Sequence, residues 1–315
     1  MQKLKILCPE PENFSEKGLQ LMASIGHLDA VPLSQQDFEV MAPDYDILAV
    51  RLQLHITAEI IHSSKKLQVI LSPTTGTDHI DIKSAKDANI KIFSLKGENV
   101  FLESVYSSAE HTFALLLSLI RYIPSSFDSV KRFEWVQGPF RGHELHGKVL
   151  GILGFGRIGK KMAHYANAFG MDVVYFDPYV DCCEGNALRL TETEEFYNRS
   201  EILTIHVPLD HSTHSLVGKK EIEMLPRDAF IVNTARGAIV DYSALLRALE
   251  TEHIAGAAID VLTCEPTLND IDLQLIEYSK THNNLIITSH IAGATWESIE
   301  KTDVFVIEKL KDWLF

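Results

Sequence analysis

The chain has 315 residues, which at about 150 residues per domain favours two domains over one. Hydrophobic residues make up 46% and charged residues 23% of it, so wholesale disorder is excluded. Asp and Glu number 43 against 29 Lys and Arg, and the formal net charge of -14 disfavours nucleic acids and anionic membranes as general partners.

The first 100 residues alternate short apolar runs with helical patterns. This alternation predicts βαβ units on a parallel sheet that is buried on both faces. The predicted strands are residues 3–8, 46–50, 67–72 and 90–95, and the predicted helices lie around residues 16–25 and 57–63.

A long helix is predicted next, over roughly residues 103–123. Its apolar residues surround nearly the whole circumference at residues 113–117. A helix of this kind is buried, either in a core or against another subunit.

A second alternating series follows the long helix. Thr191 with Glu194 has the pattern of a capping box, and Asp241 is predicted to cap a later helix. Six strands with intervening helices predict one doubly wound domain, followed by a last helix over residues 296–314. The predicted strands are residues 149–153, 172–176, 201–206, 229–233, 254–259 and 285–289.

No segment predicts membrane insertion, secretion or metal binding. The longest strongly apolar stretch, residues 112–120, is too short to span a bilayer, and the first residues contain no long apolar run. The cysteines at positions 8, 182, 183 and 264 form no C-x-x-C pair, which suits a reducing compartment and indicates no zinc site. We therefore expect a soluble cytoplasmic protein.

A glycine-rich turn, Gly154-Phe155-Gly156-Arg157-Ile158-Gly159, follows the first strand of the second series and opens a helix. Gly154 would permit the tight turn, Gly156 would let a pyrophosphate approach the backbone, and Gly159 would allow close helix–strand packing. A turn of this kind can also be purely structural.

An acid in the next strand strengthens the case for a dinucleotide. Asp177 lies 18 residues after Gly159, where a carboxylate accepts hydrogen bonds from the ribose hydroxyls of adenosine. Because it also repels a 2′-phosphate, strand, turn, helix and acid together predict NAD rather than NADP.

Three side chains that could carry hydride chemistry follow strands of the second series: Arg236, Glu265 and His290. Reduction of a 2-keto acid by NADH needs a cation for the carboxylate, a proton donor for the keto oxygen and a group that tunes this donor. Ligands of an open parallel sheet bind at the carboxyl ends of its strands, so the three side chains could converge there.

Four motifs in order together resemble the D-isomer-specific 2-hydroxyacid dehydrogenases. They are the glycine turn, Asn-Thr-Ala-Arg-Gly at 233–237, the stretch 260–266 and Ser-His-Ile-Ala-Gly at 289–293. Further matches lie at residues 75–81, 109–112 and 206–209, so that the resemblance runs over nearly the whole chain.

This resemblance implies an α/β fold of two doubly wound parallel-sheet domains. A flavodoxin-like substrate domain would comprise residues 1–100 and 291–315, and a Rossmann NAD-binding domain, residues 101–290, would be inserted into it. A homodimer would form on the long helix and nearby arms of the NAD-binding domain.

The resemblance also implies roles for individual residues. Arg236 would hold the substrate carboxylate and keto group. His290 would be the acid in reduction and the base in oxidation, and Glu265 would hydrogen-bond its imidazole and favour the protonated form. Arg157, Ile158, Pro208, Thr234 and Asp260 would join the glycine turn and Asp177 in binding NAD, and Arg51, Thr75 and Gly76 would contact the substrate.

Several alternatives stay open at this point. The substrate could be of the phosphoglycerate, hydroxypyruvate or glyoxylate, or lactate type. An NAD(H)-sensing binding protein, like the corepressors that share this fold, can retain the same three residues. A methyltransferase would use the glycine turn for another adenosine ligand but would leave Arg236, Glu265 and His290 unexplained.

Overall fold

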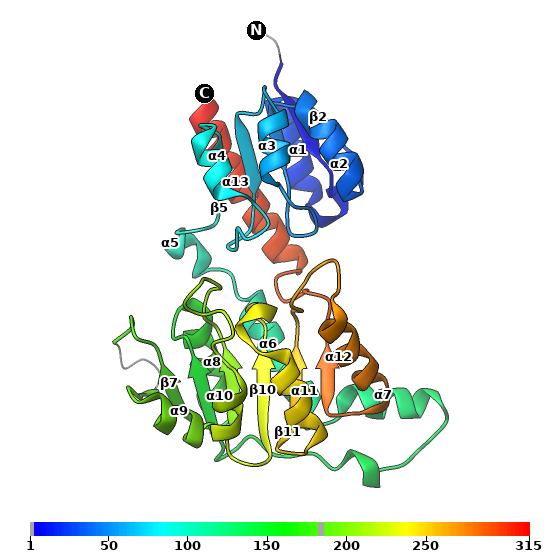
Figure 1. The fold of residues 1–315 in the computed structure, drawn as a ribbon, viewed down its shortest axis with the longest axis vertical. Coiled ribbons are helices and arrows are strands. Elements are labelled where there is room, and N and C mark those ends of the chain that lie inside the picture. Colours follow the sequence, from blue (N-terminus) through cyan, green and yellow to red (C-terminus); the bar gives the residue numbers. More distant parts are fainter. Residues whose placement is uncertain (1–2, 182–185) are drawn as a thin grey trace. The chain divides into compact units, whose positions relative to one another are not determined.

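The computed structural model describes residues 3–181 and 186–315 (Figure 1). Cys182 and Cys183 lie outside these residues. The chain divides into two compact units, the first formed by residues 1–105 and 294–315 and the second by residues 106–293. Each unit contains its own parallel sheet, so the prediction of an α/β fold with two doubly wound sheets is confirmed.

The sheet of the first unit has five strands in the order β2-β1-β3-β4-β5, which is the flavodoxin-like order. The strands are β1 (Lys5–Cys8), β2 (His27–Ala30), β3 (Ile47–Ala49), β4 (Val69–Ser72) and β5 (Lys91–Ser94). The helices are α1 (Glu16–Ile25), α2 (Gln35–Met41), α3 (Ala58–Ser63), α4 (Ile82–Asp87), α5 (Asn99–Leu102) and α13 (Trp296–Leu314).

The last helix, α13, belongs to the first unit although it ends the chain. Val306, Ile307 and Leu310 are buried in the same hydrophobic cluster as Ile6 of β1 and Val69 of β4. Burying this apolar stripe against the sheet gives the helix its place in the fold.

The sheet of the second unit has seven strands in the order β12-β11-β10-β9-β6-β7-β8, a Rossmann order with one added strand. The strands are β6 (Val149–Leu153), β7 (Asp172–Phe176), β8 (Leu188–Arg189), β9 (Ile202–Ile205), β10 (Ala229–Asn233), β11 (Ile254–Ile259) and β12 (Leu285–Ile287). The helices are α6 (Ser107–Ile120), α7 (Ile123–Lys131), α8 (Arg157–Ala168), α9 (Thr193–Arg199), α10 (Lys219–Met224), α11 (Tyr242–Glu250) and α12 (Asp270–Thr281).

The register of this sheet places the ends of three strands at one edge. Asn233 of β10 pairs with Ile259 of β11, and Ile259 pairs with Ile287 of β12. The residues that follow these strands therefore emerge side by side, and this edge carries the candidate site described below.

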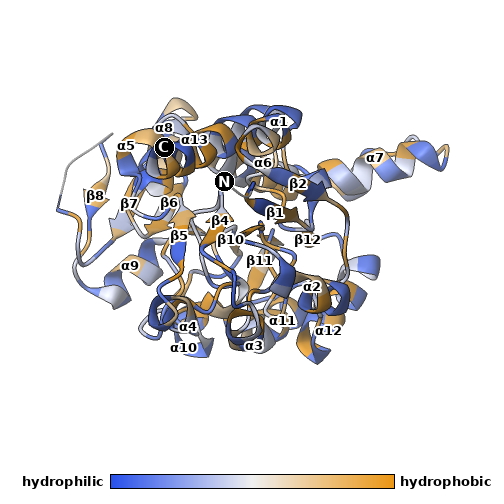
Figure 2. Ribbon diagram, turned by 90° about the horizontal axis from the view of Figure 1, so that it is seen from above, coloured by the Kyte–Doolittle hydropathy of each residue, from blue (hydrophilic) through white to orange (hydrophobic). Residues whose placement is uncertain are grey.

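The long helix predicted over residues 103–123 is confirmed as α6, which is shorter and covers Ser107–Ile120. The chain adopts a left-handed conformation at Tyr122, with φ of 51°, and this turn separates α6 from α7. α6 is buried along much of its length, whereas α7 projects from the rest of the second unit and carries both hydrophobic and hydrophilic residues (Figure 2).

The two predicted helix caps have different outcomes. Asp241 caps α11, because its Oδ1 accepts hydrogen bonds from the N–H groups of Ser243 and Ala244. The capping box of Thr191 and Glu194 is wrong, since α9 begins after Glu192, whose side chain makes no capping hydrogen bond. The N-terminus of α9 instead carries Glu194 and Glu195 in its first turn, which complement the helix dipole.

Within the described residues, no single helix is both long and apolar enough to cross a membrane. The α6–α7 pair meets that criterion only when taken together, by length and composition, and is bent by 63°.

Candidate active site

The glycine turn lies between β6 and α8, and its three glycines differ in what surrounds them. Gly154 has a φ of 91°, and a Cβ there would lie 2.8 Å from the Val207 side chain. A Cβ on Gly159 would lie 2.3 Å from the Gly154 carbonyl oxygen, so close helix–strand packing requires this glycine. No heavy atom lies within 4 Å of a Cβ on Gly156, which leaves the backbone open to a ligand at the N-terminus of α8.

Asp177 lies beside this turn, directly after β7. Its Oδ2 accepts a hydrogen bond from the Phe155 N–H at 2.8 Å, and its Oδ1 accepts from the N–H groups of Tyr179 and Val180 at 2.8 and 3.2 Å. The carboxylate therefore joins the glycine turn to the loop after β7. An open backbone cradle with an acid at its side fits a dinucleotide with free ribose hydroxyls.

His206 contributes a neutral imidazole near the same turn. Burial, together with the nearby Arg157 guanidinium, lowers the pKa of His206 to about 3. Its Nε2 hydrogen-bonds the Thr204 hydroxyl at 2.8 Å. Pro208 follows in the exposed loop after β9.

The three candidate catalytic residues follow three neighbouring strands: Arg236 follows β10, Glu265 follows β11 and His290 follows β12. His290 Nδ1 and Glu265 Oε2 are 2.5 Å apart, and both side chains are about one quarter exposed, at 23% and 28%. The other oxygen of Glu265 accepts the backbone N–H of Leu262. Arg236 Nη1 donates to the Ala235 carbonyl at 2.8 Å.

Asp260 holds the backbone around His290. Its fully buried carboxylate accepts hydrogen bonds from the N–H groups of Ile291 and Ala292 at 2.9 and 2.8 Å, and its carbonyl accepts the His290 N–H. His290 adopts a left-handed conformation with φ of 56°, so that the two following N–H groups can point at the carboxylate.

His111 and Thr288 complete the surroundings of this carboxylate. The Thr288 hydroxyl donates to Asp260 Oδ1 at 2.6 Å, and His111 Nε2 lies 3.3 Å from the same oxygen. Burial alone would raise the pKa of Asp260, but these groups and the two N–H donors outweigh it and hold the pKa below its usual range. The carboxylate therefore stays ionised where it positions His290.

Sequence reasoning quoted His111 only as part of a motif and missed Thr288. A second contact of the same kind joins α6 to the end of β10, where the hydroxyls of Thr112 and Thr234 are 2.7 Å apart. The contacts of His111 and Thr112 depend on how α6 packs across the strand ends, and the pattern of strands in the sequence does not predict them. The role of Asp260 in binding NAD stays a prediction.

The predicted substrate residues lie in the first unit, after β3 and β4. Thr75 is exposed and Gly76 is half-buried. The Arg51 guanidinium forms an ion pair with the buried Asp303, donates to the Thr302 hydroxyl at 3.3 Å and lies 5.2 Å from the Phe14 ring centroid.

The loop that starts at Arg51 is held by a second buried acid. The Glu10 carboxylate accepts the backbone N–H groups of Arg51, Gln53 and Leu54 at 3.2 to 3.3 Å. Burial raises the pKa of Glu10, although these hydrogen bonds oppose the shift. Arg51 thus has a structural role in the first unit, and its contact with substrate stays a prediction.

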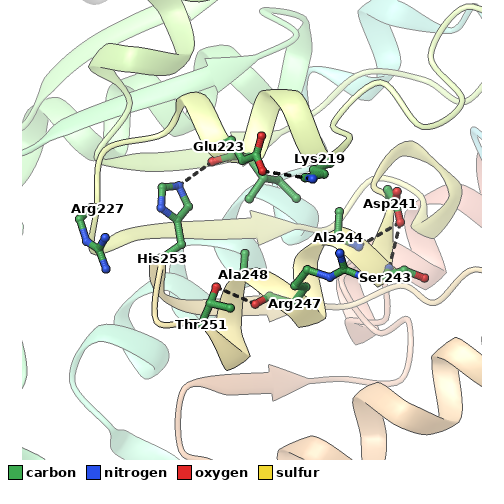
Figure 3. Close-up of a pocket in the computed structure, with 11 residues that line it drawn as sticks. Lys219, Glu223, Arg227, Asp241, Ser243, Ala244, Arg247, Ala248, Thr251 and His253 are labelled. Carbon is green, nitrogen blue, oxygen red and sulfur yellow. Dashed lines mark hydrogen bonds and ion pairs between the residues drawn. The ribbon is translucent and has the colours of Figure 1, made fainter.

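A surface hollow of about 500 Å³ lies elsewhere in the second unit, between α10 and α11 (Figure 3). It contains none of the predicted site residues. Its charged lining includes Lys219, which pairs with Glu223 at 3.6 Å, and the exposed Arg227 and Arg247. Among residues 3–181 and 186–315, no group of three or more His, Cys, Asp or Glu is placed to hold a metal ion.

Comparison with known proteins identifies relatives along the whole chain. The family model "D-isomer specific 2-hydroxyacid dehydrogenase, NAD binding domain" matches residues 113–292. The D-3-phosphoglycerate dehydrogenase of Methanocaldococcus jannaschii is 33% identical over 98% of this chain and 57% of its own length. The hydroxypyruvate reductase of Thermotoga maritima is 31% identical over 88% of both chains.

Among solved structures, D-lactate dehydrogenase from Aquifex aeolicus, complexed with NAD and lactic acid, has a TM-score of 0.83 and 26% identity. The match covers 98% of this chain and 95% of that one. The chain spans only about half the length of the phosphoglycerate dehydrogenases that it matches. The glycine turn, the motif order and these matches agree, and the chain therefore belongs to the D-isomer-specific 2-hydroxyacid dehydrogenase family, with an NAD-binding domain at residues 113–292.

Proposed function

We propose that the protein is an NAD-dependent dehydrogenase that transfers a hydride between NAD(H) and C2 of a D-2-hydroxy acid or its 2-keto form. The observation that carries this proposal is the contact of His290 Nδ1 with Glu265 Oε2, in the same unit as the glycine turn. Bound nicotinamide supplies or accepts the hydride.

The side chains of the protein supply the proton and bind the substrate carboxylate. Because Glu265 occupies Nδ1, the Nε2 of His290 is the nitrogen left to give a proton to the keto oxygen during reduction, and to take it back during oxidation. Glu265 stabilises the imidazolium by its charge. Arg236 binds the substrate carboxylate, since a guanidinium can donate two parallel hydrogen bonds to it.

A panel of 2-keto acids tests this proposal. The substrate is of the hydroxypyruvate or glyoxylate, phosphoglycerate, or lactate type, and the panel contains hydroxypyruvate, glyoxylate, 3-phosphohydroxypyruvate and pyruvate. We expect at least one of them to be turned over, with NADH oxidation followed by absorbance. Tight NADH binding without turnover on any of them would instead favour an NAD(H)-sensing binding protein.

We expect removal of the Asp177 charge to relax the preference for NAD over NADP. The carboxylate repels a 2′-phosphate, so Asp177→Ala and Asp177→Asn should raise the ratio of kcat/KM for NADPH to that for NADH by about tenfold, the effect of roughly 1.4 kcal/mol. The asparagine keeps an acceptor for the backbone N–H groups that Asp177 binds. Asp172→Asn, on the exposed start of β7, is the control. An unchanged ratio in both Asp177 variants would contradict the assignment.

We also propose that the protein is a homodimer formed through α7 and the residues after it. Phe133 is fully exposed and Trp135 is 90% exposed, and Phe127 on α7 is 62% exposed. Aromatic side chains so exposed on a projecting segment favour a protein partner, and a second copy of the same segment is self-complementary in a twofold dimer.

Charge introduced on this segment is expected to separate the dimer. Phe133→Glu combined with Trp135→Glu should convert a dimer into a monomer, measured as molar mass by light scattering after gel filtration. Val40→Glu, on an exposed residue of α2 in the first unit, should leave the mass unchanged. A monomeric wild type, or a double variant that stays dimeric, would refute this interface.

We propose that the protein is located in the cytoplasm, because two of its cysteines have free thiols. Cys8 is buried and Cys264 is exposed, and both are free. A reducing compartment keeps an exposed thiol in this form. Cell fractionation with immunodetection tests the location, and recovery in a membrane or extracellular fraction would contradict it.

A further inference from the structure

A buried chain of hydrogen bonds connects the loop that carries Arg236 with the loop that carries Glu265. Asn233 ends β10 and Tyr242 begins α11, and both are buried, at 0% and 2% exposure. Asn233 Nδ2 donates to the Tyr242 hydroxyl at 3.3 Å, and this hydroxyl donates to the Val261 carbonyl at 2.6 Å. Side chains thus join the ends of two neighbouring strands.

Asn233 also determines the conformation of the Arg236 loop. Its Oδ1 accepts the Ala235 N–H at 3.0 Å, and its Nδ2 donates to the Arg236 carbonyl at 3.0 Å. The amide therefore binds the backbone on both sides of the peptide bond that joins Ala235 to Arg236. A shift of Asn233 would move the base of the Arg236 side chain.

The other end of the chain of hydrogen bonds reaches Glu265. Val261 directly precedes Leu262, whose N–H donates to the Glu265 carboxylate. The Tyr242 hydroxyl therefore holds the backbone next to the donor that orients Glu265. The Tyr242 hydroxyl thus acts on the position of Glu265, and Glu265 contacts His290 Nδ1.

The two loops also touch directly at Gly237. A Cβ on this residue would lie 2.2 Å from both the carbonyl carbon and the oxygen of Leu262. The space beside the Gly237 backbone is therefore too small for a side chain, and it leaves little room for one loop to move toward the other. The Tyr242 hydroxyl supplies the opposite constraint, because its hydrogen bonds keep the loops from separating.

The tyrosine hydroxyl is a structural donor and not a proton-transfer group. Burial raises the pKa of Tyr242 well above its usual range, so the hydroxyl stays protonated and donates to Val261. The ring packs in a hydrophobic cluster that phenylalanine would fill equally well. Only the hydroxyl distinguishes Tyr242 from phenylalanine, and its two partners are the Val261 carbonyl and Asn233.

We propose that Tyr242 is a positioning residue that keeps Arg236 and the Glu265–His290 pair in register. Its hydroxyl holds the carboxylate-binding cation and the proton donor at a constant separation, so that one small substrate can engage both. This inference rests on the dehydrogenase function proposed above.

Tyr242→Phe tests the role of the hydroxyl, with Tyr197→Phe as a matched control. Tyr197 is buried in the same hydrophobic cluster, and its hydroxyl makes no hydrogen bond to the described residues. For the best 2-keto acid of the panel, Tyr242→Phe should lower kcat about tenfold and raise KM, because misplaced catalytic groups lose rate steeply. The Kd for NADH should stay within about twofold of the wild-type value, a change of under 0.5 kcal/mol. Kinetics equal to those of Tyr197→Phe would overturn the proposal.

A double-variant comparison separates positioning from general destabilisation. If Tyr242 acts through Glu265, then adding Tyr242→Phe to Glu265→Gln should lower kcat by less than it does in the wild type. Equal effects in both backgrounds would overturn the proposal.

Hydrogen exchange gives a readout that does not depend on turnover. In Tyr242→Phe, the amides of residues 234–237 and 261–265 should exchange faster, while α8 (Arg157–Ala168) reports whether the unit stays folded. Unchanged exchange in both loops would overturn the inference. If the wild type reduces no keto acid, the proposed function fails, but the exchange experiment still tests the connection.

Discussion

His290→Ala is expected to lower kcat by about 10²–10⁴-fold, the contribution typical of general acid–base catalysis. The imidazole contacts Glu265 through Nδ1 at 2.5 Å and is the proposed donor to the keto oxygen. The Kd for NADH should change little, because the glycine turn and Asp177 lie after β6 and β7 and not after β12. The rate of NADH oxidation at saturating keto acid measures the loss.

His253→Ala is the matched control for this variant. His253 also lies in the second unit, where its Nε2 hydrogen-bonds the Ile222 carbonyl beside the hollow of Figure 3. Its removal should leave kcat within about twofold of the wild-type value, or about 0.4 kcal/mol in the activation free energy. A His290→Ala enzyme that turns over at a rate close to that of the wild type would refute the assignment of the proton donor.

Arg236→Ala is expected to raise KM for the keto acid by about 10²-fold, because a desolvated charge pair loses roughly 2–5 kcal/mol when one partner is truncated. Arg236→Lys keeps the charge but not the planar pair of donors, so its KM should lie between those of the wild type and the alanine variant. The test compares KM for a keto acid with that for its neutral amide analogue. The wild type should discriminate strongly between the two, and Arg236→Ala should not.

Arg247→Ala serves as the control for Arg236, since Arg247 is an exposed arginine of the same unit. An unchanged KM in Arg236→Ala, or an equal rise in Arg247→Ala, would show that the carboxylate is bound elsewhere.

The strands that the sequence predicted best are those buried on both faces. The bounds of β6, β7, β10 and β11 agree with the predicted ranges, because a continuous apolar run bounded by turn residues marks such a strand. The strands β2 and β8 were missed. β2 (His27–Ala30) has no buried residue and β8 (Leu188–Arg189) has only two residues, so neither carries an apolar run.

The predictions for helices failed where tertiary packing overrides the local pattern. The helix predicted over residues 103–123 is shorter in the structure, where α6 covers Ser107–Ile120 and Tyr122 adopts a left-handed conformation that the apolar pattern does not indicate. The helices α2 and α4 were not predicted, because their apolar stripes are short. α13, in contrast, was predicted with correct bounds, since Thr295 caps a long amphipathic stretch.

In the glycine turn the chemistry of the candidate site was predictable from local sequence, because Gly154 and Gly159 meet demands of the turn itself and Gly156 leaves its backbone open. The Glu265–His290 contact was expected from the family resemblance, and the strand topology agrees with it, since neighbouring parallel strands place their following residues together. The resemblance gave Asp260 a role in binding NAD. Its contact with His111 comes from the packing of α6, and its contact with Thr288 comes from the pairing of β11 with β12.

The sequence by itself determined the α/β class through apolar periodicities, and the family and the cofactor through short motifs. Each of these signals involves residues that are close together in the chain. Only the tertiary structure decided that Arg51 pairs with Asp303, that Asp260 holds His290, and that Tyr242 joins the loops of Arg236 and Glu265. Each of these contacts joins residues that are distant in the chain or depends on the direction of one side chain in a packed interior. Such contacts exist only once the sheets have assembled and buried polar groups must find partners.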